Sequence, residues 1–293
     1  MPSKIKIIRA IQFVFLGLKL SNRPHPYKLY LNISNKCNFK CCNCPRINQL
    51  SGSREMQSED AERILEEAYN IGCRLATISG PSGEVSIHPD FYHILKIAKK
   101  RGFNVNFTTN GWNIDPAKLS MLEPVDRIRI SIDRMHLEGA PDPLAYISRL
   151  SSVIEECINL KLSVYVVIHG ESTQEIDKML NKMGVIVYNY PLITCSPVPN
   201  QSGNKSAFRC IDPWTSIYIQ YDLTVNPCCR ASESVGSITD RIKLSDVWFG
   251  KNLMSFRKMV ASQNPPLICL SCDRSRRNFY QWCKTVYNNK SMI

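Results

Sequence analysis

Three cysteines, Cys37, Cys41 and Cys44, form a C-x3-C-x2-C segment that is suited to metal chemistry. Three thiolates on one short loop can hold three irons of a 4Fe–4S cluster. The fourth iron then has no protein ligand and can bind a small molecule. A structural zinc site normally has four ligands, often C-x2-C pairs or histidines. Cys42 has little freedom to point the same way as its neighbours, so the spacing favours a cluster with one open iron.

Short polar motifs follow the cysteine loop, each directly after a predicted strand. The segment from Ser79 to Val85 reads SGPSGEV, and two later segments read TNG and SID. Alone each motif is a weak signal, because glycine-rich and Asn-Gly turns are common. Their order, each at the end of a strand, predicts a shared binding site. The residues concerned are Gly80, Gly83, Glu84, Thr109, Asn110, Ser131 and Asp133.

Together these motifs resemble the radical S-adenosylmethionine (SAM) superfamily. The three cysteines match its signature, and SGPSGEV is similar to its glycine–glycine–glutamate–proline motif, with two residues inserted and Val85 in place of the proline. Asn43 stands where many members have an aromatic residue. The resemblance implies that SAM binds the open iron and that its reductive cleavage gives a 5′-deoxyadenosyl radical, which removes a hydrogen atom from substrate.

The resemblance also implies which residues and partners serve the cofactor. An electron donor of the flavodoxin or ferredoxin type is expected to reduce the cluster. The residues expected to contact SAM are Phe39, Gly80, Gly83, Glu84, Thr109, Asn110 and Ser131.

Strand-like and helix-like segments alternate between residues 28 and 190. Strands are predicted at 28–33, 75–78, 104–108, 127–132, 162–168 and 185–190; helices are predicted at 58–71, with Ser58 as the cap, and at 90–101, 116–122, 143–160 and 173–183. This alternation predicts parallel strands with right-handed crossovers. Six units are too few for a closed eight-stranded barrel. We therefore expect an α/β fold, an open, partial (β/α)6 TIM-like barrel with its site at the carboxyl ends of the strands.

A second cysteine-rich region follows a linker rich in Pro, Ser and Asn. A hairpin is predicted from 217–220 and 224–225, and a helix at 244–260, which gives a small α+β domain. This region resembles the twitch or SPASM extensions that bind auxiliary iron–sulfur clusters. One 4Fe–4S cluster is expected, with Cys229 as an alternative to Cys228, Cys283 as a further candidate, and a zinc ribbon left open. The expected ligands are Cys210, Cys228, Cys269 and Cys272.

The first residues form a predicted basic amphipathic helix. Ile8, Ile11, Phe15 and Leu18 fall on one helical face, and the apolar run 11–18 is too short to span a bilayer. Such a helix can pack on the catalytic domain or make weak contact with a membrane surface. The predicted organisation is thus a helix at 1–26, a partial barrel at 27–192 and an auxiliary-cluster domain at 193–293.

The composition limits the class of protein. With 293 residues, 44% of them hydrophobic, the chain can form a substantial core. Thirteen cysteines, an odd number in a long chain, fit metal sites in the reducing cytoplasm better than secreted disulfides. The net charge of +12 suits anionic partners, but no long Lys/Arg run suggests nucleic acid.

Two chemical outcomes are compatible with these features. The chain is similar to the aminocyclitol dehydrogenase of butirosin biosynthesis and the epimerase of neomycin biosynthesis. The resemblance implies oxidation, with an auxiliary cluster taking the electron, or epimerisation, with a thiol returning a hydrogen atom. A sugar or aminocyclitol substrate is favoured, and the basic charge would suit a phosphorylated or lipid-linked one. The candidate thiols are Cys195 and Cys283, and the candidate bases are Asp133, His136 and His169.

Two alternatives stay open at this point. The chain can be a peptide-modifying enzyme of the class that matures sulfatases or ribosomal peptides, although the short region before Cys37 weighs against a leader-peptide domain. It can also be a non-catalytic iron–sulfur or zinc-binding protein. The motif around Gly80 and Glu84 argues against the latter, because an electron carrier needs no SAM site.

Overall fold

The computed structural model describes residues 25–41, 44, 52, 54–80, 83–122, 125–190, 210–231, 233–262, 264–270 and 272. Within these residues the chain forms one curved sheet in the order β6-β5-β4-β3-β2-β1-β7-β8-β9. Its parallel part comprises β1 (Lys28–Leu31), β2 (Leu75–Ile78), β3 (Asn104–Thr109), β4 (Arg127–Ser131), β5 (Val164–His169) and β6 (Ile186–Tyr190). The predicted partial barrel of six parallel strands is confirmed.

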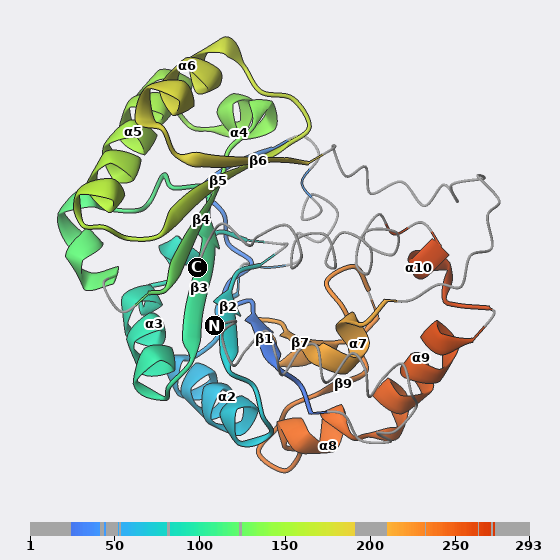
Figure 1. Ribbon diagram of the computed structural model, residues 1–293. Coiled ribbons are helices and arrows are strands. Elements are labelled where there is room, and N and C mark those ends of the chain that lie inside the picture. Colours follow the sequence, from blue (N-terminus) through green and yellow to red (C-terminus); the bar gives the residue numbers. More distant parts are fainter. Residues whose placement is uncertain are drawn as a thin grey trace, which may run out of the picture.

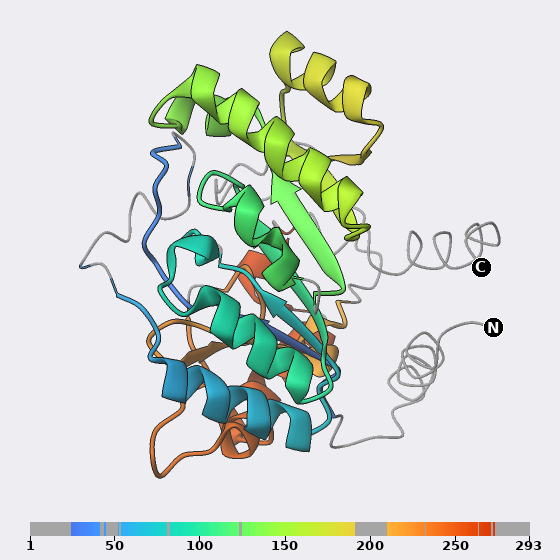
Figure 2. The same ribbon diagram turned by 90° about the vertical axis from the view of Figure 1, so that its left-hand side faces the viewer.

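Helices cover the outer side of the curved sheet, as Figure 1 shows, and Figure 2 presents this helical layer to the viewer. Four of them follow the strands in the expected places: α2 (Ser58–Asn70), α3 (Phe91–Lys100), α5 (Pro143–Asn159) and α6 (Gln174–Met183). The apolar residues of α3 show why it packs there. Phe91, Ile94, Leu95 and Ala98 recur at helical spacing and are all buried.

The two faces of each strand have different environments, because side chains alternate along a strand. Leu29, Phe107 and Ile130 are among the outward-facing residues, and they belong to the buried core beneath the helices. Fully burying one such side chain stabilises the fold by about 1.5–3 kcal/mol. The alternate residues face the concave side of the sheet and are taken up below.

The C-terminal region continues the same sheet. β7 (Ser216–Ile219) pairs in parallel with β1, and Lys28 lies opposite Ser216. β8 (Thr224–Asn226) and β9 (Gly236–Ser237) follow in antiparallel order, which confirms the predicted hairpin. Although a separate domain was expected, its first strand is therefore an integral part of the barrel sheet.

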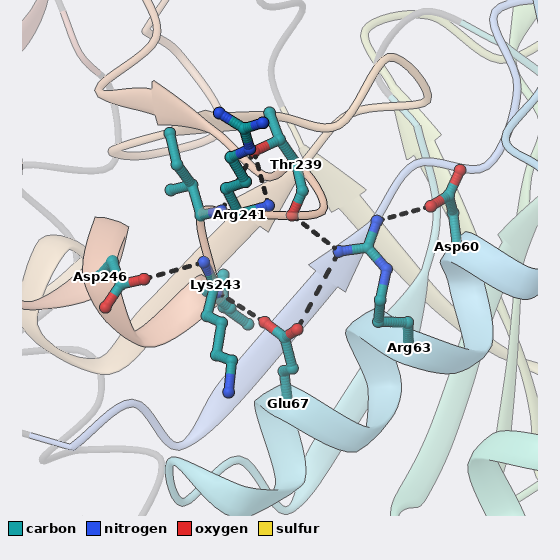
Figure 3. Close-up of polar contacts among 9 residues, drawn as sticks. Asp60, Arg63, Glu67, Thr239, Arg241, Lys243 and Asp246 are labelled. Atoms are coloured by element: carbon teal, nitrogen blue, oxygen red, sulfur yellow. Dashed lines mark hydrogen bonds and ion pairs between the residues drawn. The ribbon is translucent and has the colours of Figure 1, made fainter.

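Polar contacts join the C-terminal region to α2 (Figure 3). Arg63 forms an ion pair with Asp60 at 2.6 Å and donates a hydrogen bond to the Thr239 carbonyl at 3.3 Å. The backbone N–H of Leu244 donates to Glu67 Oε2 at 2.6 Å. The last contact satisfies a backbone donor in the first turn of α8 (Leu244–Trp248), so α2 and α8 are held together.

Two local expectations were wrong. Gln57, not Ser58, is the N-cap residue of α2, and the Ser58 hydroxyl instead donates to Asp90 Oδ2 at 2.6 Å. The helix predicted at 244–260 is two helices, α8 and α9 (Lys251–Ala261). They are separated at Gly250, where an added Cβ would lie 2.5 Å from the Asp246 carbonyl oxygen. The short helix predicted at 116–122 is confirmed as the 3-10 helix η3 (Pro116–Leu122).

The remaining helices are short. They are η2 (Val85–Ile87), α4 (Arg134–Gly139), α7 (Asp212–Thr215) and α10 (Leu267–Leu270). Among the described residues, no helix is long and apolar enough to cross a membrane. The helix predicted at 1–26 lies outside the described residues except for its last two positions.

Candidate functional site

The cysteine loop follows β1, at the carboxyl end of the parallel strands. Burial, together with the neighbouring Cys37 and Cys44 thiols, raises the pKa of Cys41 to about 12. The three sulfurs therefore lie near one another, as cluster binding requires. Asn38 Nδ2 and Asp133 Oδ2, both buried in this region, have no hydrogen-bond partner in the described residues. Converging thiols beside unmet polar atoms fit an iron–sulfur cluster with a polar ligand.

The glycine-rich turn packs against the backbone that leads to Cys37. A Cβ at Gly83 would collide with the Ser34 carbonyl oxygen, and one at Gly80 would collide with the Asn32 side chain. The Glu84 backbone N–H also donates to the Lys36 carbonyl at 2.7 Å. Both glycines are thus needed for close approach to the cluster loop. Their contact with SAM stays a prediction.

The Glu84 carboxylate is buried, with 4% of the residue exposed, and both of its oxygens accept hydrogen bonds from the protein. Oε1 accepts hydrogen bonds from the backbone and hydroxyl of Ser86, at 3.0 and 2.6 Å, and from Thr109 Oγ1 at 2.7 Å. Oε2 accepts from the Asn110 backbone N–H at 2.7 Å. Glu84 therefore ties the end of β2 to the end of β3, and the predicted contact between its carboxylate and SAM is untested.

Asn110 and Phe39 connect this network to the cysteine loop. Asn110 Nδ2 donates to Asn38 Oδ1 at 2.9 Å, and the Tyr146 hydroxyl donates to the Asn110 carbonyl at 2.6 Å. The buried Phe39 ring stands perpendicular to Tyr146, with centroids 4.9 Å apart, and also contacts Trp112. No local sequence pattern marks Asn38, Trp112 or Tyr146, because their role depends on tertiary packing.

Helix α4 was missed by the sequence analysis, although it holds the loop from the other side. Lys40 N–H donates to the Gly139 carbonyl at 3.0 Å, and an added Cβ on Gly139 would lie 2.8 Å from the backbone nitrogen of Cys41. Asp133 caps α4 by accepting from the His136 backbone N–H. An Asp three residues before a polar helical residue was the signal available in the sequence. Ser131, predicted to contact SAM, ends β4 just before this cap.

Asp133 also binds the His136 ring, with Oδ1 and Nδ1 2.8 Å apart. Burial alone would raise the pKa of Asp133, but hydrogen bonds from His136 outweigh it and hold that pKa below its ordinary value. An ionised carboxylate assigns the imidazole proton to Nδ1. Nε2 is then the acceptor, and it makes no hydrogen bond to any described residue.

His169 has a different environment. Arg129 Nη2 lies 2.9 Å from His169 Nε2, and a guanidinium can only donate, so His169 accepts through this nitrogen. Its ring also stacks on Tyr190, with centroids 5.6 Å apart. His88 is buried; its Nε2 lies 2.8 Å from the Met56 carbonyl oxygen, and its Nδ1 accepts a hydrogen bond from the Asp90 backbone N–H at 3.1 Å.

The C-terminal cysteines converge on a second site. Burial raises the pKa of Cys228 to about 12 and that of Cys269 to about 11, and it raises the pKa of Cys210 as well, with Cys228 and Cys272 adding to that shift. One pocket is lined by all the predicted ligands and by the alternative: Cys210, Cys228, Cys229, Cys269 and Cys272. The choice between Cys228 and Cys229 stays open.

No three Cys, His, Asp or Glu side chains in the described part of the chain are arranged around a single metal ion. Thiolates bind zinc as well as iron–sulfur clusters, so the cysteines by themselves do not select the metal.

The two cysteine sites lie at opposite ends of neighbouring strands. Cys37 follows the carboxyl end of β1, whereas Cys210 precedes the amino end of β7. β1 and β7 run in parallel and in register, and four residues of strand span ~13 Å. The two sites are therefore separated along the strand direction of the sheet. The candidate thiols Cys195 and Cys283 lie outside the described residues.

Sequence comparison identifies both regions. The profile of the Radical SAM superfamily matches residues 31–183, and that of the SPASM iron–sulfur cluster-binding domain matches residues 210–273. A probable GTP 3′,8-cyclase of Pyrococcus abyssi is 31% identical over 108 residues, which are 36% of this chain and 35% of the relative. Mycofactocin maturase MftC of Mycolicibacterium smegmatis is 28% identical over 116 residues, 39% and 29% of the two chains. The chain thus spans about a third of the length of the curated relatives it matches.

Solved structures share the fold at low sequence identity. BtrN in complex with AdoMet and 2-DOIA superposes with a TM-score of 0.57 at 16% identity, over 86% of this chain and 94% of that one. anSMEcpe with bound AdoMet and the Cp18Cys peptide gives 0.61 at 14% identity, over 81% and 84%. Streptococcus suis SuiB bound to the precursor peptide SuiA gives 0.53 at 16% identity, over 90% and 75%.

Proposed function

The chain belongs to the radical SAM superfamily and carries a SPASM domain, and from this premise we propose that it oxidises or epimerises a carbon of a small carbohydrate or aminocyclitol. The radical SAM domain binds SAM and a 4Fe–4S cluster, and the SPASM domain binds auxiliary iron–sulfur clusters. Cys37, Cys41 and Cys44 are the proposed ligands of the first. We propose one auxiliary cluster, held by Cys210, Cys228, Cys269 and Cys272.

When bound, these groups supply a 5′-deoxyadenosyl radical that takes a hydrogen atom from substrate and a second cluster that can take up an electron. The chain's residues must then hold the substrate between the two sites. The observation that carries the proposal is the concave face of the sheet, which presents hydrogen-bonding side chains such as Thr77, Asn106 and Tyr188. Polyhydroxylated molecules need such donors and acceptors.

His136 is the proposed general base for oxidation. Asp133 fixes its tautomer, so Nε2 can accept the proton of the substrate hydroxyl as the carbon becomes a carbonyl. Asp133 acts as a positioning residue in this proposal. His169 is less suited, because its Nε2 already accepts a hydrogen bond from Arg129.

Epimerisation requires a different donor. A thiol must return a hydrogen atom to the opposite face of the substrate radical, and Cys195 and Cys283 are the proposed candidates. The two outcomes differ in products: oxidation removes two hydrogens from the substrate, whereas epimerisation leaves its mass unchanged.

A peptide substrate is the second candidate. It is favoured by likeness to the mycofactocin maturase and to structures that contain peptides, anSMEcpe and SuiB. The two structures share the fold over 81% and 90% of this chain at 14% and 16% identity. For either substrate we propose a flavodoxin or ferredoxin as the electron donor and the cytoplasm as the location, because reduced clusters and thiols persist there.

Turnover in deuterated water tests the proposal. Anaerobically reconstituted protein is incubated with SAM, dithionite and panels of aminocyclitols, amino sugars and peptides, and 5′-deoxyadenosine is measured by mass spectrometry. A sugar product two hydrogens lighter indicates oxidation, and deuterium in a product otherwise unchanged in mass indicates epimerisation. Substrate-dependent 5′-deoxyadenosine with peptides alone would replace the carbohydrate proposal by the peptide one.

A further inference from the structure

The concave face of the sheet carries cations but no acidic residue at its strand positions. The paired register places Tyr30, Thr77, Asn106 and Arg127 in one row across β1 to β4, and Thr108 beside Arg129 in the next row. The charged strand residues on this face are Lys28, Arg127 and Arg129, and none is Asp or Glu.

Arg129 lacks a counter-ion in the described part of the chain. Its Nη2 binds the neutral acceptor His169 Nε2, and its Nε is buried without a hydrogen-bond partner. Arg129 is half-buried, and a buried N–H group such as its Nε normally has a hydrogen-bond acceptor. The environment of Arg129 is therefore incomplete within the described residues.

Neighbouring groups on the same face are also unsatisfied. Thr77 Oγ1 and Asn106 Oδ1 are buried and have no hydrogen-bond partner among the described residues. Arg127, the next residue in that row, lies with its guanidinium 5.8 Å from the centroid of the Tyr165 ring, and it forms no ion pair with the described residues. Unmet polar atoms gathered on one face indicate a ligand surface, because buried polar groups normally have partners.

We propose that the substrate carries an oxyanion, a phosphate or a carboxylate, which Arg129 binds with the help of Arg127. The planar guanidinium fork matches both groups and makes strong charge-assisted hydrogen bonds to them. Asn106 and Thr77 then bind hydroxyl groups of the substrate body. This inference deepens the proposed function and rests on it for the identity of the site.

The position of Arg129 also orients the substrate. Its guanidinium reaches His169, which is the last residue of β5 and lies at the carboxyl edge of the sheet. The anionic group is thus bound close to the reacting end of the face. A purely structural Arg129 would instead fill space and position His169, and the two roles predict different behaviour of variants.

Three sugars with the same ring test whether the site binds a phosphate, a carboxylate or neither. Glucose 6-phosphate, glucuronate and glucose are titrated by calorimetry into the reconstituted full chain. At least one anion is expected to bind tenfold more tightly than glucose, and the preferred one identifies phosphate or carboxylate. Equal affinity for all three would overturn the proposal.

Variants then locate the site. Arg129→Met is expected to weaken anion binding about tenfold and leave glucose unaffected, and Arg129→Lys, which keeps the charge but loses the fork, about threefold. Arg101→Met, on the outer helix layer, is the control, and its anion affinity should match that of the unaltered chain. An anion preference that survives Arg129→Met contradicts the assignment.

Thermal unfolding distinguishes a binding role from a structural one. Because Arg129 lacks a counter-ion, Arg129→Met should leave the Tm unchanged or raise it. A lowered Tm with intact anion preference would show a structural role and overturn the proposal. Binding is measured without turnover, so failure to cleave SAM would contradict the proposed function while leaving this inference standing.

Discussion

The carboxyl ends of β2 and β3 and the concave face beneath them use their polar groups in different ways. At the strand ends Glu84 and Asn110 are saturated by hydrogen bonds from the chain itself. On the concave face Thr77, Asn106 and Arg129 each keep a buried atom without a partner in the described residues. A saturated network holds one geometry, as a fixed cofactor requires, whereas unmet groups are available to a substrate.

The largest effect should follow loss of a ligand to the first cluster. Cys41→Ala leaves two protein ligands for three irons, so SAM cleavage should fall below detection, measured as 5′-deoxyadenosine formed with dithionite. Cys73→Ala, at a buried cysteine of the core, is the matched control. It should keep its iron and its SAM cleavage despite lower stability, and loss of cleavage in that control would contradict the ligand assignment.

The second cysteine site should behave separately from the first. The double variant Cys269→Ala/Cys272→Ala should lose about half of the iron, because it removes two of four ligands from one of two clusters. Uncoupled SAM cleavage should persist, while oxidation of substrate should stop. Iron content and 5′-deoxyadenosine are measured on the same sample. Unchanged iron would refute the auxiliary site.

His136, in α4, tests the base assignment. His136→Asn should reduce substrate oxidation about a hundredfold or more, as expected for loss of a general base. SAM cleavage without substrate should be retained. The exposed His93→Asn is the control. If His136→Asn oxidises substrate at the normal rate, the base is another group.

Glu84 tests how firmly the strand ends are held. Glu84→Gln replaces an acceptor oxygen by a donor that faces other donors, so the free energy of unfolding should fall by about 1–3 kcal/mol. Chemical denaturation of the full chain measures it. The exposed Glu62→Gln serves for comparison and should change stability little. Equal, small decreases in the free energy of unfolding of the two variants would mean that the Glu84 hydrogen-bond network does not stabilise the strand ends.

Gly139 gives the smallest expected effect. Gly139→Ala crowds the backbone of Cys41, so the fraction of protein that loads the first cluster should drop severalfold while the fold persists. Gly184→Ala introduces backbone strain at φ +63° with no neighbour within 4 Å, and it should leave loading unchanged. Equal loading of the first cluster in both variants would show that α4 does not support the cysteine loop.

The features of the fold and the site that could be predicted are those with a local pattern in the sequence. The alternation of apolar strands and amphipathic helices predicted the six-stranded partial barrel, and cysteine spacing predicted both metal sites. The parallel pairing of β1 with β7 was not predicted, because residues 28 and 216 share no local pattern. The roles of Asn38 and Tyr146 arise only after folding brings them to Asn110.

Helix α4 could not be predicted from the sequence for a different reason. It has six residues and buries none of them fully, so it lacks the apolar periodicity by which helices are recognised. Its importance comes from the approach of Gly139 to Cys41. The unmet atoms of the concave face were equally invisible, because burial without a partner is a property of the folded chain.

Spectroscopy of the first cluster tests the central claim, that it keeps one open iron. The Cys269→Ala/Cys272→Ala variant isolates this cluster, and electron paramagnetic resonance is recorded on the dithionite-reduced protein with and without SAM. We predict the signal of a reduced 4Fe–4S cluster that changes when SAM is added. A signal that SAM leaves unchanged, or a zinc-filled site with no signal, would contradict the account.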